Sequence, residues 1–153
     1  TTLQVRRSKV WQIEAQLEEG ADATIQGMGG SWAQDLESAK HDHEQHLLEA
    51  ARLVEAGVRI IPGMDAGMGW LPFGQFVDEI ECLVLAGLSP MRAILAATGE
   101  SAKAIDLQHL TGTLQEGKMA DLVVVNGDPT KNIRDAANVA AVWLEGERVS
   151  GVS

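Results

Sequence analysis

Apolar side chains recur every three or four positions through most of the N-terminal part of the chain. This spacing places them on one face of a helix and predicts helices over 10–19 and 31–56, the second closed by Gly57. Three shorter helices are predicted further along, over 76–86, 89–99 and 100–105. Between the first two helices, the glycine-rich stretch 21–30 predicts a loop.

Short apolar or β-branched runs without that spacing predict strands. Val58–Ile61 follows a helix-ending glycine and favours a buried parallel strand, and Thr1–Val5 has a strand-like character as well. Near the C-terminus, runs flanked by turn residues predict a small sheet from 122–125 and a hairpin of 139–144 and 148–149. The change of pattern near residue 110 predicts two parts, 1–109 and 110–153.

One acid stands where the predicted strand 58–61 ends. Asp65 follows Pro62, which cannot donate a ladder hydrogen bond, and is flanked by Gly63 and Gly67. The loops beyond the carboxyl ends of parallel strands carry the chemistry of α/β folds, so Asp65 is a candidate functional residue. Aspartate beside glycine is also common turn chemistry, and these residues alone favour the turn. A phosphate cradle is disfavoured because no Gly-Lys-Ser or Gly-Lys-Thr follows.

Three of the four histidines, His41, His43 and His46, lie on the predicted helix 31–56. Residues two apart on a helix point about 200° from each other, so His41 and His43 cannot bind one metal ion there. His43 and His46 could do so. However, His43 falls on the apolar face, where a hydrogen-bonded core histidine is the commoner outcome, and we assign no metal site to this group.

Charge and cysteine content narrow the class of partner. With 22 acidic and 12 basic residues, the net charge of −10 repels phosphate backbones and anionic membranes and disfavours nucleic acid as a partner. The single cysteine, Cys82, lies in an apolar helix pattern, which predicts a buried residue in a reducing compartment. No apolar run approaches the ~20 residues that span a bilayer. These features predict a cytoplasmic protein.

Four short motifs follow one another between roughly residues 55 and 149. They are Glu55-Ala56-Gly57-Val58, then Gly63-x-Asp65-Ala66-Gly67, then Ala86-Gly87-Leu88-Ser89-Pro90 leading to Ala96-Ala97-Thr98, and finally Gly112-Thr113-Leu114-x-x-Gly117-Lys118-x-Ala120-Asp121-Leu122-Val123-Val124. Their order and spacing resemble the C-terminal third of the metal-dependent amidohydrolases, close to the imidazolonepropionase-like and Xaa-Pro-dipeptidase-like branch.

The resemblance implies an α/β fold. Members of that family have a (β/α)8 barrel of TIM type and a small β-sandwich built from both ends of the chain. Residues 1–109 would be the C-terminal piece of the barrel, with Thr1–Val5 as strand seven and Val58–Ile61 as strand eight. Residues 110–153 would be part of the composite sandwich, in which Asp121 resembles a structural strand-turn residue.

The resemblance also implies a site. Asp65 matches the acid at the end of the last strand, which touches the metal and moves a proton from the attacking water to the leaving amine. One or two divalent ions, most often zinc, are implied, with the remaining ligands outside this chain. Substrate contacts are implied for the loop residues Met64, Gly67 and Phe73. Met64 stands where the family usually has threonine. Phe73 stands near the position where many family members have a histidine, so the substrate contacts of this loop differ from the family pattern.

The family's other metal-binding residues have no counterparts here, and His41-Asp42-His43 on a helix is no substitute. Two strands cannot close an eight-stranded barrel. We therefore expect a piece of a hydrolase acting on amide, cyclic amide or dipeptide C–N bonds, inactive without its N-terminal barrel segment or a complementing chain. A homo-oligomer is compatible with the sequence. Two alternatives remain open, a non-catalytic binding module on the same scaffold and a flavodoxin-like domain, the latter disfavoured because too few strands are visible.

Overall fold

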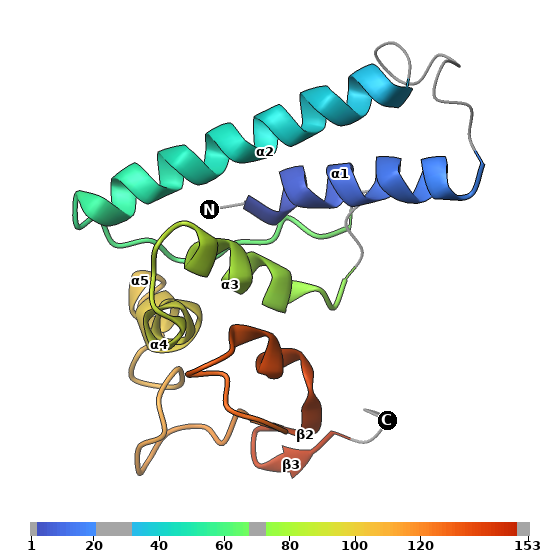
Figure 1. Cartoon of the computed structure of the whole chain (residues 1–153). Coiled ribbons are helices and arrows are strands. Elements are labelled where there is room, and N and C mark those ends of the chain that lie inside the picture. Colours follow the sequence, from blue (N-terminus) through green and yellow to red (C-terminus); the bar gives the residue numbers. More distant parts are fainter. Residues whose placement is uncertain (1–2, 21–31, 68–72, 150–153) are drawn as a thin grey trace.

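The computed structural model of the 153-residue chain describes three stretches, 3–20, 32–67 and 73–149. Two long helices, α1 (Leu3–Glu18) and α2 (Trp32–Glu55), lie side by side, and the shorter α3 (Phe76–Leu85) packs against α1 (Figure 1). The predicted loop 21–30 lies outside the described residues. Among the helices described, none is long and apolar enough to cross a membrane.

The strand predicted over Thr1–Val5 is wrong where the structure describes it. Helix α1 begins at Leu3, and the first two residues lie outside the described stretches. Leu3, Val10 and Ile13 are all buried, the first against α2 and α3 and the other two against α2. The helical face predicted for 10–19 therefore continues back to Leu3, and packing outweighs the local strand preference.

Helix α2 ends at the glycine that the sequence assigns as its stop. Gly57 has a φ of 73° and donates its N–H to the carbonyl of Val54 at 3.0 Å, while the N–H of Val58 donates to Leu53 at 3.0 Å. These two bonds form a Schellman motif, which needs a left-handed residue that glycine adopts without steric cost. The predicted long helix and its end are confirmed, although residue 31 lies outside the described part.

The second predicted barrel strand, Val58–Ile61, is also wrong for this chain, because residues 58–61 are irregular. Val58 is 50% exposed, and Ile60 is buried in the core below α2. Strands are stabilised by ladder hydrogen bonds to neighbouring strands. The sheet of the described residues lies on the far side of α3 and α4 and offers this segment no ladder (Figure 1).

The helices after α3 follow the predicted order with one change of boundary. Ser89 is the N-cap of helix α4 (Pro90–Leu95), and its Oγ accepts a hydrogen bond from the N–H of Arg92 at 3.3 Å. The predicted break at residue 99 is absent, since a π-helical turn, Ala96–Glu100, joins α4 to α5 (Ser101–Ala104). Gly99 instead permits a close approach of chain segments, because a Cβ atom there would lie 3.3 Å from the carbonyl oxygen of Gly112.

The C-terminal part forms a three-stranded antiparallel sheet of order β1-β2-β3, as predicted. Its strands are β1 (Leu122–Val125), β2 (Val139–Leu144) and β3 (Glu147–Arg148), with a 3-10 helix, η2 (Ile133–Ala137), before β2. Leu122 pairs with Trp143, and β2 and β3 form the predicted hairpin across Glu145-Gly146. Val123 and Val124 point to opposite faces of β1, yet both are exposed. Each face of β1 therefore keeps an exposed valine in the part of the chain that the structure describes.

One core cluster joins the helical layer to the C-terminal part. Its members come from α1, α2, the segment after α2, α3 and its C-cap, α4, the π-helical turn and η2: Leu3, Ala50, Ile60, Ile80, Cys82, Leu83, Ala86, Ala93, Ala96 and Ile133. Ile133 is the member supplied by η2, and it is 5% exposed. Burial of this side chain against α3 anchors η2 to the helices.

Candidate active site

Asp65 lies in the irregular loop between α2 and α3, shortly after Pro62. Its backbone has a φ of 51°, and the residue is exposed. Aspartate is one of the few residues other than glycine that adopt this left-handed conformation, because its short polar side chain bonds locally. The local turn chemistry that the sequence indicates is therefore compatible with a carboxylate presented to a substrate.

Two of the residues assigned to substrate contact, Gly67 and Phe73, lie against each other. Gly67 has a φ of 108°, and a Cβ atom on it would lie 3.3 Å from Cζ of Phe73. The Phe73 ring is thus packed on the Gly67 backbone, yet the residue remains 81% exposed. Met64 is half-buried in the same loop. The intervening residues 68–72 lie outside the described part of the chain.

The described residues do not form a metal site by themselves. Within 3–20, 32–67 and 73–149, no group of three or more His, Cys, Asp or Glu side chains could hold an ion. Asp65 can supply one carboxylate ligand, and a metal site in a protein requires several donors. The described residues alone therefore do not fit a resident metal ion.

The histidines of α2 take other roles than metal binding. Nδ1 of His46 lies 2.7 Å from the carbonyl oxygen of Asp42 on its own helix and donates to it. Nδ1 of His43 is buried and has no hydrogen-bond partner in the described structure, so the predicted hydrogen-bonded core histidine is only half right. Burial, followed by the nearby charge of Arg7, lowers the pKa of His43 below its ordinary value of 6.5.

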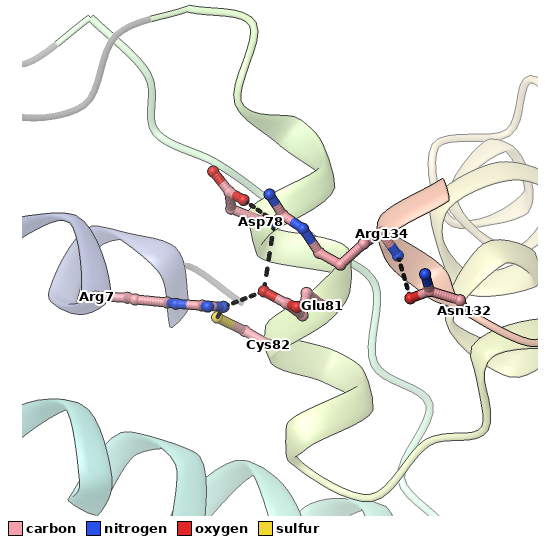
Figure 2. Close-up of polar contacts among 6 residues, drawn as sticks. All are labelled: Arg7, Asp78, Glu81, Cys82, Asn132 and Arg134. Atoms are coloured by element: carbon pink, nitrogen blue, oxygen red, sulfur yellow. Dashed lines mark hydrogen bonds and ion pairs between the residues drawn. The ribbon is translucent and has the colours of Figure 1, made fainter. Parts of the chain in front are cut away.

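A charged cluster that the sequence analysis misses surrounds α3. Nη1 of Arg7, from α1, donates to Oε2 of Glu81 at 2.5 Å. Nη1 of Arg134, from η2, pairs with Asp78 and lies 3.4 Å from the same oxygen of Glu81 (Figure 2). The side chains of Asp78 and Glu81 are only 11% and 19% exposed. Acids on the buried side of an apolar helix were the available signal, since such groups need cationic partners.

Cys82 is buried beside this cluster, as predicted. Its Sγ lies 4.0 Å from Nη1 of Arg7, and the residue has no exposed surface. Burial raises the pKa of the Cys82 thiol to about 11 even though the arginine acts in the opposite direction. The thiol is therefore protonated at neutral pH and serves as a small core residue.

Asp121 has the bonds of a structural residue. Its Oδ2 accepts a hydrogen bond from Oγ1 of Thr111 at 3.2 Å, and its Oδ1 accepts one from the N–H of Glu145 at 2.9 Å. These bonds tie the chain before β1 to the hairpin turn. They support the structural role that the sequence suggests and leave Asp65 as the candidate for chemistry.

Comparison with known proteins identifies similar sequences. Residues 12–149 match the model of the amidohydrolase family. The imidazolonepropionase of Geobacillus kaustophilus is 40% identical over 80 residues, which cover 51% of this chain and 19% of that protein. The ochratoxinase of Aspergillus niger is 31% identical over 113 residues, which cover 71% of this chain and 23% of that protein.

Solved structures of hydrolases are also similar to this chain over most of its length. A Xaa-Pro dipeptidase with methionine bound in its active site is 27% identical with a TM-score of 0.69, over 94% of this chain and 34% of that one. Molinate hydrolase is 27% identical with a TM-score of 0.63, over 71% of this chain and 26% of that one. The chain thus spans roughly a fifth to a third of the length of the relatives that it matches.

Proposed function

The chain belongs to the amidohydrolase family, and from this we propose that it supplies the C-terminal third of a metal-dependent hydrolase of amide, cyclic amide or dipeptide C–N bonds. The dipeptidase and imidazolonepropionase relatives support the bond class. The chain's short share of their length supports its being one part of a larger catalytic unit.

The observation that carries the proposal is the position of Asp65. Its carboxylate stands exposed in the loop between α2 and α3, inside the motif Gly63-x-Asp65-Ala66-Gly67. We assign it the transfer of a proton from the attacking water to the nitrogen of the leaving amine. A divalent ion, most often zinc in such enzymes, would when bound lower the pKa of water to about 7 and polarise the carbonyl, and Asp65 would be a ligand that this chain supplies to it. The remaining ligands for one or two such ions would come from outside this chain.

Phe73, Gly67 and Met64 are proposed to contact the substrate. The exposed Phe73 ring offers an apolar surface against the loop that carries Asp65, and Gly67 gives the ring room to lie close to that loop. An apolar group on the substrate near the scissile bond would pack against this ring.

The protein is proposed to be cytoplasmic. The isolated polypeptide is proposed to be inactive unless the N-terminal barrel segment or a complementing chain is present. One carboxylate does not bind zinc against water, and among the described residues β1 keeps an exposed valine on each face. The intact mass of the polypeptide from its native source tests this. A mass near three times 16.4 kDa supports the proposal. A mass of 16.4 kDa together with hydrolysis by that polypeptide would overturn it.

Replacement of the acid tests the chemical role. Asp65→Asn in the complete enzyme should lower kcat by about 100-fold or more with little change in Tm, because asparagine keeps the shape and the left-handed backbone but cannot carry the proton. The assay uses a panel of Xaa-Pro dipeptides, cyclic amides and imidazolone propionate, and the substrate with the fastest turnover is kept.

Asp106→Asn is the matched control. Asp106 is also an exposed aspartate with a positive φ, 61° against 51° for Asp65, but it lies at the end of α5. The same chemical change there should leave kcat within twofold. Equal kcat for Asp65→Asn and the unchanged enzyme would contradict the catalytic assignment of Asp65. Absence of turnover of every panel substrate by the complete protein would instead favour the alternative, a binding module that retained the amidohydrolase scaffold.

A further inference from the structure

Arg134 projects from a turn whose backbone is fixed by its neighbours. Oδ1 of Asn132 accepts a hydrogen bond from the N–H of Arg134 at 3.3 Å, and its Nδ2 donates to Oδ1 of Asp135 at 3.0 Å. Ile133 is buried in the core cluster that contains Ile80 of α3. Because the backbone is held on both sides, the guanidinium of Arg134 approaches α3 from a defined direction (Figure 2).

The contact falls at the start of α3, close to the candidate site. Asp78, the partner of Arg134, lies in the first turn of α3. Phe73 comes shortly before this turn and packs on Gly67, which belongs to the loop of Asp65. The backbone from Phe73 to Asp78 and the contact between Phe73 and Gly67 therefore connect the ion pair to the loop of the candidate carboxylate.

Two features distinguish this cluster from an ordinary surface ion pair. The carboxylate of Glu81 contacts Arg7 of α1 and Arg134 of η2, so it links two parts of the chain to α3 (Figure 2). Both acids are largely buried, and ion pairs of this kind are screened less by solvent than exposed ones. The orientation of α3 is therefore set by charge as well as by apolar packing.

We propose that Arg134 is a positioning residue for Asp65. By pairing with Asp78 and Glu81, it fixes the start of α3 and thereby the Phe73 ring and the loop that presents the carboxylate. This inference rests on the function proposed above for Asp65. A misplacement of about 1 Å in a reacting group can cost about 100-fold in rate, so Arg134 is expected to affect turnover although it touches no reacting atom.

A double-mutant cycle in the complete enzyme tests the inference. We compare Arg134→Gln in the natural enzyme and in the Asp65→Asn background, measuring kcat, KM and Tm with the selected panel substrate. Arg134→Gln should lower kcat about tenfold when Asp65 is present. The same change should lower it less than twofold in the Asp65→Asn background, because a positioning residue has no effect once the group that it positions is gone.

Two further variants separate positioning from general stability. Arg92→Gln is the matched control, because the Arg92 side chain is 54% exposed against 47% for Arg134 and pairs with Glu100 at 3.1 Å within its own helical segment. It should leave kcat within twofold. Arg134→Lys keeps a cation between the two carboxylates and should recover most of kcat. A purely structural role would lower Tm without this pattern in kcat.

The outcomes distinguish the two proposals. If Arg134→Gln lowered kcat by the same factor in both backgrounds, or changed Tm alone, the positioning role would be overturned and the role of Asp65 would remain intact. An Asp65→Asn enzyme with natural turnover would overturn both. A tenfold effect confined to the enzyme that contains Asp65 supports both.

Discussion

Gly112 lies so close to Ala102 that a Cβ atom on it would be 2.6 Å from the Ala102 Cβ atom. The same atom would lie 3.1 Å from the carbonyl oxygen of Thr98 and 3.2 Å from Cα of Gly99. Real Cβ atoms essentially never show the first of these distances, and the other two are tighter than most real Cβ contacts. Gly112 therefore marks the point where the chain entering the β-sheet crosses the last helical turns.

Replacement of this glycine should destabilise the protein strongly. Gly112→Ala adds a methyl group both to a crowded contact and to a left-handed backbone, with a φ of 89°. Strain of about 1–2 kcal/mol and overpacking of about 1–3 kcal/mol should together lower the free energy of unfolding. Chemical denaturation of the complete protein measures the loss.

Gly117→Ala separates the two contributions. Gly117 has nearly the same φ, 84°, but a Cβ atom there meets nothing within 4 Å. Only the backbone strain of about 1–2 kcal/mol should remain. Equal losses for the two alanine variants would show that the Ala102 contact costs nothing.

The environment of His43 predicts a loss of stability in mild acid. The side chain faces Arg7 of α1 and has Glu44 and His46 beside it on α2, and its pKa in the folded protein is below 6.5. The unfolded chain therefore takes up a proton first as the pH falls. Stability from this group is present above pH 6.5 and declines as the pH falls towards the folded pKa.

Measurement of Tm against pH in His43→Gln checks this. The variant should show a smaller fall in Tm below pH 6.5 than the natural protein. His109→Gln, which removes an exposed histidine after α5, is the control and should leave the profile unchanged. If Tm of His43→Gln fell with pH as it does in the natural protein, another group would cause the acid sensitivity.

Asp121 should behave in the opposite way to Asp65. Asp121→Ala removes the acceptor for both Thr111 and the N–H of Glu145, so the free energy of unfolding should fall by about 1–3 kcal/mol. Asp121→Asn keeps one carbonyl oxygen and should lose less. At a temperature where each variant is fully folded, kcat should equal that of the natural enzyme, and a selective loss of kcat would contradict the structural role.

Elements encoded by short-range chemistry could be predicted from the sequence. The stop at Gly57, the start at Ser89 and the hairpin across Glu145-Gly146 each depend on a few adjacent residues, and all three are present. The strands predicted over Thr1–Val5 and Val58–Ile61 depended on partners in a larger sheet. Without such partners among the described residues, the first segment extends a helix and the second is irregular.

In the candidate site as well, contacts between residues close in sequence could be predicted, and contacts between distant residues could not. The neighbourhood of Asp65, Gly67 and Phe73 follows from closeness in sequence, and the structure brings the last two into contact. The cluster of Arg7, Glu81 and Arg134 could not be predicted, because it joins residues 74 and 53 positions apart that share no motif. Only the packing of α1 and η2 on α3 brings these charges together.

The shared carboxylate of Glu81 has a consequence for the order in which the protein matures during synthesis. Arg7 precedes Glu81 in the chain and leaves the ribosome first, whereas Arg134 follows it by 53 positions. Helices α1 and α3 therefore emerge before η2. Until η2 has emerged, Arg7 is the arginine of this cluster that is available to Glu81, and the contact from Arg134 can form only afterwards.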